Sequence, residues 1–172
     1  MVTKASVPDL IICVGNPERG DDGLGWAVAD ALTERLPPDV HLLRVRGETT
    51  DLLDAWTGAI HVVLVDAILS QSAPVGTIYR FDAIAEELPR DIFCCSTHGW
   101  GVAEAVALGR VLGRLPQKLT IYGVEGHDFR HGVALSTRVA QAVPELVERI
   151  LREFSKEQES SSPSPDDAES DD

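Results

Sequence analysis

Short apolar runs that end at a glycine or an aspartate constrain the fold of this chain more than any other feature of its sequence. Residues 10–14 read LIICV and are closed by Gly15, while residues 60–65 read IHVVLV and lead directly into Asp66. Strands that are apolar on both sides are typical of a parallel sheet covered on both faces. Shorter runs predict further strands at residues 40–45, 77–81 and 118–122.

Segments with apolar residues at helical spacing lie between these runs. They predict helices at residues 24–32, 50–56, 101–112 and 136–154. Strands and helices that alternate in this way imply an α/β fold, a three-layer sandwich in which helices cover both faces of a mostly parallel, twisted sheet of about five strands. The turn at residues 74–76 is short, so we expect the strand at 77–81 beside the preceding strand, as an edge strand that can run antiparallel.

The charge distribution separates a body from a tail. The chain of 172 residues has 15 Lys and Arg against 28 Asp and Glu, a formal net charge of −13. Residues 155–172 contain seven of the acids and one Lys, which leaves a net charge of −7 for residues 1–154. We therefore expect one domain over residues 1–154 and a disordered acidic tail over residues 155–172. A chain this acidic is not expected to bind nucleic acid.

Membrane and export signals are not apparent in the sequence. No apolar stretch approaches the roughly 20 residues that cross a bilayer, and no apolar segment precedes a small-residue cleavage site. These features predict a cytoplasmic protein with no membrane association, and the acidic surface favours a monomer. The three cysteines, Cys13, Cys94 and Cys95, have no framework spacing and are expected to be reduced thiols.

Three polar residues are candidates for a site at one edge of the sheet, because open parallel sheets bind ligands beyond the carboxyl ends of their strands. Asp66 follows a buried strand, Asp22 lies eight residues beyond the first strand, and His98 lies in a loop next to a glycine, before a helix. Two carboxylates and one imidazole suit a borderline divalent ion such as nickel, zinc or manganese. Three protein ligands would leave a position open for chemistry.

Other interpretations of these residues stay open, because their spacing fits no local metal motif. Asp22 can cap a helix, Asp66 can tie a loop, and His98 can form an ordinary hydrogen bond. The glycines of the first loop do not have the spacing of a dinucleotide-binding motif, so no nucleotide is expected. The sequence also contains no Gly-x-Ser-x-Gly element, which disfavours a serine hydrolase.

Three segments, in order and spacing, resemble the hydrogenase maturation endopeptidases. They are Val14-Gly15-Asn16 with Gly20-Asp21-Asp22-Gly23-x-Gly25, then Val63-Leu64-Val65-Asp66-Ala67, and then Ser96-x-His98. The resemblance extends from about residue 10 to 152 and includes residues 119–124 and 132–136. It implies hydrolysis of a peptide bond, since this family removes a C-terminal peptide from the large-subunit precursor of nickel-iron hydrogenases after nickel insertion.

The resemblance also implies roles for individual residues. Asp22, Asp66 and His98 match the catalytic residues of the family, which contact a nickel ion that belongs to the precursor. Gly20 and Gly23 match glycines that permit the tight loop. Asp21, which lies between Gly20 and Asp22, supports that loop or caps a helix.

A departure from the family pattern concerns substrate binding. Gly47-Glu48-Thr49 stands where the family typically has two glycines followed by Thr or Ser. The resemblance places Glu48 and Thr49 at the substrate groove, where the side chain of Glu48 would narrow or recharge it. The specificity for a particular precursor is therefore open.

Three alternatives belong to other functional classes. A non-catalytic maturation factor would bind a metal-loaded partner without cutting it. An esterase of the peptidyl-tRNA hydrolase kind is suggested by the turn at Gly15-Asn16-Pro17, but residues 18–40 contain no His and the net charge of −13 would repel tRNA. An α/β binding domain with capped loops remains if the three matching segments are accidental.

Replacement of His98 by Ala is expected to abolish processing of the precursor and to leave folding nearly intact. The imidazole would be a metal contact in a loop, so its loss removes chemistry without opening the core. Cleavage can be followed by the mass of the precursor and folding by circular dichroism. Full cleavage by the variant would refute the assignment of His98.

Overall fold

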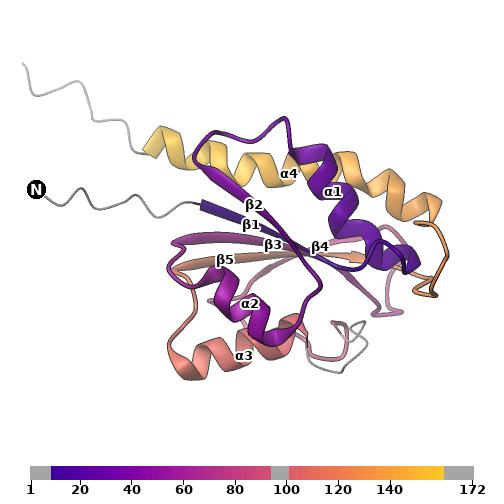
Figure 1. Ribbon diagram of the computed structural model, residues 1–172, viewed down its shortest axis with the longest axis horizontal. Coiled ribbons are helices and arrows are strands. Elements are labelled where there is room, and N and C mark those ends of the chain that lie inside the picture. The colour runs from indigo at the N-terminus through magenta and orange to yellow at the C-terminus, as the bar shows by residue number, and fades with distance from the viewer. Residues whose placement is uncertain (1–8, 94–100, 161–172) are drawn as a thin grey trace, which may run out of the picture.

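The computed structural model describes residues 9–93 and 101–160 of the chain. It contains five strands, four α-helices and one 3₁₀ helix, η1 (Figure 1). In chain order these are β1 (Asp9–Val14), η1 (Gly20–Gly23), α1 (Leu24–Leu32), β2 (Val40–Val45), α2 (Thr49–Trp56), β3 (His61–Ile68), β4 (Ile78–Asp82), α3 (Val102–Leu112), β5 (Lys118–Glu125) and α4 (Thr137–Ser160).

The five strands form one sheet in the order β2-β1-β3-β5-β4. Strands β2, β1, β3 and β5 are parallel, and β4 is an antiparallel edge strand. The predicted mostly parallel sheet with an antiparallel edge is thus confirmed. The expected neighbour of that edge strand was wrong, because β4 pairs with β5 and not with β3. Strand β3 already pairs with β1 on one side and with β5 on the other, so it has no edge left for β4.

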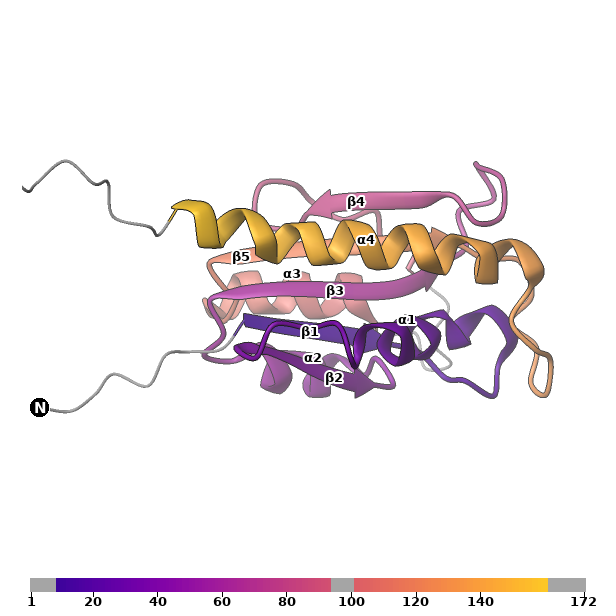
Figure 2. The ribbon, with the colours of Figure 1, turned by 90° about the horizontal axis from the view of Figure 1, so that it is seen from above.

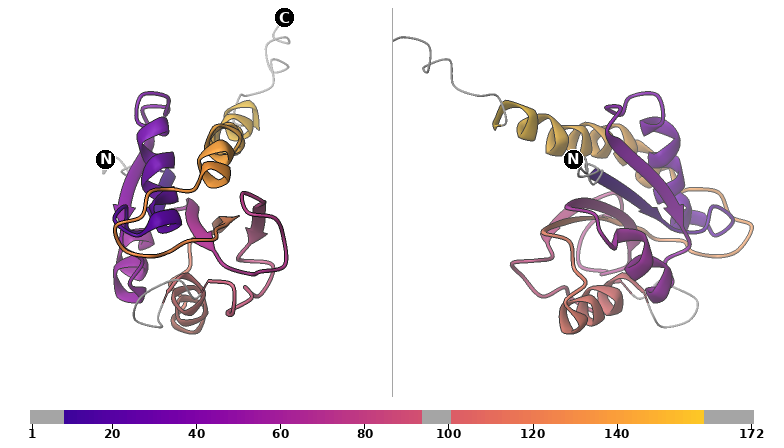
Figure 3. Two further views of the ribbon diagram at one scale, coloured as in Figure 1. Left: turned by 90° about the vertical axis from the view of Figure 1, so that its right-hand side faces the viewer. Right: turned by 60° about the vertical axis from the view of Figure 1, so that its left-hand side comes forward.

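Helices cover both faces of the sheet and complete the predicted three layers. Figure 1 shows α1 and α4 on one face and α2 and α3 on the other, and the end-on view in the left panel of Figure 3 shows the same arrangement. Alternate residues of β3 enter the two cores: Val63 and Val65 pack with α1 and α4, whereas Leu64 and Ile68 pack with α2 and α3. Both cores exclude water almost completely, which accounts for the apolar runs in the sequence.

Several elements are longer than the sequence pattern predicted. Strand β3 continues to Ile68, so Asp66 lies within the strand rather than after it, because pairing with β5 continues beyond the apolar run. Helix α4 continues to Ser160, beyond its expected end at residue 154 (Figure 2). Although α4 has 24 residues, no helix in the described ranges is long and apolar enough to cross a membrane.

Candidate active site at the carboxyl edge of the sheet

Asp66 is a buried carboxylate near the carboxyl end of β3, with 8% of its surface exposed. It shares a strand face with Leu64 and Ile68, so it belongs to the side of the sheet covered by α2 and α3. Burial raises the pKa of Asp66 well above its ordinary value, and repulsion from the Asp22 carboxylate raises it further. The backbone N–H of Ala67 lowers the pKa but does not offset these effects.

Asp22 lies in η1, which packs against β3, and is also 8% exposed. Its Oδ2 accepts a hydrogen bond from the backbone N–H of Asn16 at 3.1 Å and lies 3.8 Å from the guanidinium of Arg19. Burial raises the pKa of Asp22, while the charges of Arg19 and Arg46 and the Asn16 N–H oppose the rise. Two carboxylates that are buried and repel each other are suited to bind a cation or to hold a proton between them.

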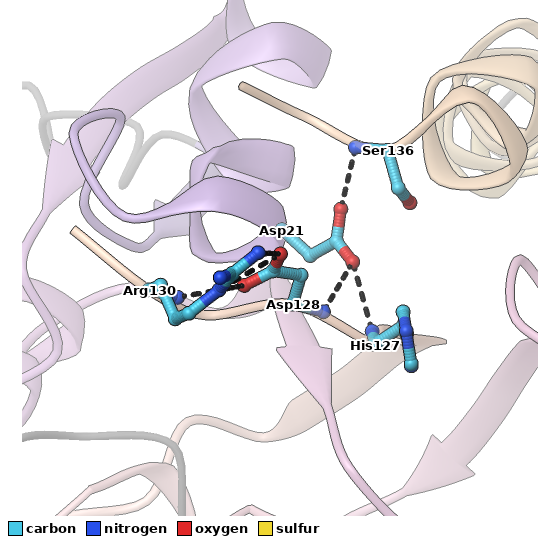
Figure 4. A network of polar contacts seen from close by, with 5 residues as sticks. All are labelled: Asp21, His127, Asp128, Arg130 and Ser136. Carbon is cyan, nitrogen blue, oxygen red and sulfur yellow. Dashed lines mark hydrogen bonds and ion pairs between the residues drawn. The ribbon is translucent and has the colours of Figure 1, made fainter. Parts of the chain in front are cut away.

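Asp21 is fully buried, and its carboxylate lies among backbone N–H groups of the loop between β5 and α4 (Figure 4). Its Oδ2 accepts hydrogen bonds from the backbone N–H groups of His127 at 2.8 Å and Asp128 at 3.0 Å, and its Oδ1 accepts one from Ser136 at 2.7 Å. Burial opposes ionisation, but these three donors outweigh it and lower the pKa of Asp21. This carboxylate is therefore an ionised anchor and not a proton carrier.

The anchor joins η1 to the loop that follows β5. The N–H of Gly20 donates to Val133 O at 2.9 Å and the N–H of Asp21 donates to Asp128 O at 2.8 Å. Gly20 has a φ of +53°, and a Cβ there would fall 2.1 Å from Asp128 O, so no larger residue fits. At Gly23 a Cβ would lie 3.2 Å from the Cα of Pro17, which is a tight contact. The backbone around Asp22 thus contacts the loop after β5 at Gly20 and the turn after β1 at Gly23.

The candidate substrate-binding residues lie at the start of α2, on the same side of the sheet as Asp66. Glu48 is exposed and Thr49 is half-buried. The Oγ1 of Thr49 is buried and has no hydrogen-bond partner among the described residues. Gly47 has a φ of +93° and approaches the side chain of Val14 so closely that a Cβ would lie 2.6 Å from it, which directs the chain from β2 into α2.

His98 lies outside the described residues, as do Cys94 and Cys95. The described chain ends before this segment at Phe93, which is buried, and resumes at Gly101, just before α3. Both flanks therefore belong to the α2–α3 side of the sheet, to which Asp66 also belongs. Within residues 9–93 and 101–160, no three His, Cys, Asp or Glu residues form a group that could hold a metal ion.

Cys13 is unsuited to be a nucleophile. It lies in β1, is fully buried and forms no disulfide. Burial raises the pKa of its thiol to about 12, against an opposing effect of Arg44, so the reactive thiolate is scarce at neutral pH.

Glu125 is a structured carboxylate to which the sequence pattern assigned no role. It ends β5, is 1% exposed, and holds the loop that follows β3. Its Oε1 accepts hydrogen bonds from the backbone N–H groups of Ser70 at 3.0 Å and Gln71 at 2.9 Å, and its Oε2 accepts one from the hydroxyl of Ser70 at 2.6 Å. Gln71 has a φ of +57°, the one positive φ at a described residue other than glycine. The only signal in the sequence is an acid at the end of an apolar strand.

Replacement of Glu125 by Ala is expected to lower the free energy of unfolding by about 3 kcal/mol. The substitution leaves two N–H groups and a hydroxyl without their charged acceptor, and hydrogen bonds to charged groups contribute about 1.5–3 kcal/mol each. Ser70 is half-buried and Gln71 is exposed, so water replaces part of the lost bonding. Chemical denaturation measures the change, and hydrogen exchange at Gln71 localises it. Glu125→Gln is the matched control, since its amide oxygen still accepts. Equal stability of the Ala variant and the parent chain would contradict this account.

Comparisons with known proteins agree on one family. The sequence model of the hydrogenase maturation protease family matches residues 27–153. The hydrogenase 2 maturation protease of Escherichia coli K12 is 28% identical over 146 residues, which cover 83% of this chain and 87% of that protein. The structure of the hydrogenase maturating endopeptidase HybD from E. coli superposes with a TM-score of 0.73 at 26% identity, covering 87% of this chain and 93% of that one. The solution structure of an endopeptidase from E. coli gives 0.75 at 26% identity, covering 90% and 99%.

Proposed function

Because this chain belongs to the hydrogenase maturation protease family and is therefore an endopeptidase, we propose that it removes a C-terminal peptide from the nickel-loaded large-subunit precursor of a nickel-iron hydrogenase. The observation that most supports this substrate is the pair of buried carboxylates, Asp22 and Asp66, at the carboxyl edge of the sheet. Their mutual repulsion would be relieved by a divalent cation, and in this proposal the precursor supplies it.

Asp22, Asp66 and His98 are the proposed contacts to the nickel of the precursor. Binding through the metal would fix the scissile bond relative to the protease, so that only loaded precursor is cut. A metal ion in such a position can orient a substrate, polarise its carbonyl or lower the pKa of a bound water. No nucleotide is part of the proposed reaction.

The neighbouring residues are assigned supporting roles. Glu48 and Thr49 are proposed to contact the precursor, since Glu48 is exposed and Thr49 is half-buried at the start of α2. Gly20, Asp21 and Gly23 are proposed to keep Asp22 in place through the backbone contacts of η1. We propose that the enzyme acts as a monomer, because the net charge of −13 makes copies of the chain repel one another.

The test is to incubate the protein with the precursor of a nickel-iron hydrogenase large subunit from the same source and to measure the intact mass of the precursor. Loss of a C-terminal peptide is expected only when the precursor contains nickel. The nickel-free precursor is the matched control. An unchanged mass in both samples would refute the proposed substrate, and nickel-dependent binding without mass loss would favour a non-catalytic maturation factor.

A further inference from the structure

A basic pocket lies on the α4 side of the sheet, away from the candidate active site. It has a volume of about 310 Å³ and is lined by Arg80, Tyr122, Arg149, Arg152 and Glu153. Arg80 comes from β4, Tyr122 from β5, and the other three residues from α4. Tyr122 packs in the core between the sheet and α4, whereas Asp66 belongs to the opposite face.

The floor of this basic pocket is fixed by hydrogen bonds. Glu153 Oε1 lies 2.8 Å from Nε of Arg80, and Glu153 Oε2 lies 3.2 Å from its Nη2. The hydroxyl of Tyr122 donates to Glu153 Oε1 at 2.7 Å. Three elements of the fold therefore hold one guanidinium in a defined orientation, and its position does not depend on a ligand.

Positive charge is in excess around the pocket although the chain as a whole is acidic. Arg149 pairs with Glu145 on the same helix, and Arg152 forms no ion pair with any side chain in the described ranges. The pocket lining itself contains three arginines and one carboxylate, Glu153, in a protein whose net charge is −13.

The acidic residues at the end of the chain are close enough in sequence to α4 to contact the arginines of the basic pocket. Residues 161–172 contain five Asp and Glu and no Lys or Arg, and all five acids lie at residues 166–172. They follow α4, whose end is visible in Figure 2. From Arg152 to Ser160 the helix rises about 12 Å, and the five residues before Asp166 span up to about 17 Å when extended. The acids can therefore return to the pocket.

We propose that the basic pocket binds the acidic residues 166–172 of the same chain. Guanidinium groups recognise carboxylates through paired, charge-assisted hydrogen bonds, and Arg152 is available for them. The intramolecular link raises the effective concentration of the acids and makes this source more favourable than a separate acidic peptide. The contact would pair the positive charges of the pocket with the negative charges of residues 166–172. The proposal does not depend on the proposed peptidase function.

The test compares ¹⁵N NMR spectra of the full chain with a variant of equal length whose five tail acids are replaced, Asp to Asn and Glu to Gln. Signals of the Arg149 and Arg152 side chains and of the Tyr122 amide are expected to differ between the two chains in low salt. The differences should disappear in about 1 M NaCl, where the screening length falls to about 3 Å.

Two single substitutions complete the design. Arg152→Gln should abolish the difference between acidic and neutral tails, whereas Arg44→Gln removes the same charge on β2, at the far edge of the sheet, and should leave it unchanged. Identical spectra for the acidic and neutral tails in low salt would overturn the proposal. It would be overturned equally by differences that map to other basic residues, such as Arg19 and Arg46, and not to the pocket.

Discussion

Replacement of Asp66 by Asn is expected to abolish cleavage of the precursor while raising the free energy of unfolding at neutral pH. Outer-shell partners of metal ligands already change activity by about 10–100-fold, so the loss of a proposed direct contact should exceed about 100-fold. The gain in stability follows from burial, because an ionised carboxylate costs more to bury than a neutral amide of the same shape.

The effect of Asp66 on stability has a defined pH dependence. Its pKa is raised in the folded protein, so the folded state binds more protons than the unfolded state above the ordinary value of 3.8. Stability is therefore retained below that value and lost as the pH rises through the higher pKa of the folded state. The stability difference between Asp66→Asn and the parent chain should grow over this same range.

The measurement combines urea denaturation over a pH series with the mass-based cleavage assay. Asp39→Asn is the control, since it removes the same charge from an exposed position before β2. It should leave cleavage unchanged and retain the loss of stability with rising pH that Asp66 causes. An Asp66→Asn variant that cuts the nickel-loaded precursor at the parent rate would refute the role of Asp66. A variant less stable than the parent chain at neutral pH would show that burial of the charge is not the dominant effect.

Replacement of the neighbouring Asp21 by Ala is expected to produce the largest loss of stability, about 5 kcal/mol or more. The Ala side chain leaves the N–H groups of His127, Asp128 and Ser136 without their charged acceptor, at about 1.5–3 kcal/mol for each hydrogen bond to a charged group. A loss of this size is comparable with the entire stability of many domains. The variant is therefore expected to be largely unfolded at physiological temperature.

The pH dependence of Asp21 has the opposite sign to that of Asp66. The pKa of Asp21 is lowered by folding, so its contribution is fully present above the ordinary value of 3.8 and is lost as the pH falls through the lower folded value. Denaturation of Asp21→Asn, which keeps one acceptor oxygen, should give an intermediate stability without this acid dependence. Parent-like stability of Asp21→Ala at neutral pH would contradict the role of Asp21 as an anchor.

The roles of the adjacent residues Asp21 and Asp22 could not be told apart from the sequence. The sequence indicates that two acids follow the first strand. Nothing in the sequence pattern distinguishes an acid that anchors a loop from an acid that is a candidate metal ligand. The folded chain separates them: the carboxylate of Asp21 meets backbone donors more than 100 residues away, whereas the charge of Asp22 repels that of Asp66 and the backbone N–H of Asn16 donates to Asp22. The role of Glu125 is equally invisible in sequence, since its partners Ser70 and Gln71 lie in another loop.

By itself, the sequence determined the strands, the helices and the layered α/β class, because apolar periodicity records which side chains each element buries. It also identified the family, through short segments in a fixed order. The tertiary structure alone decided that β4 adds to β5, that β3 continues through Asp66, and which buried acid is an anchor. These features depend on hydrogen bonds and charges between residues far apart in the chain, which become neighbours only when the helices pack on the two faces of the sheet.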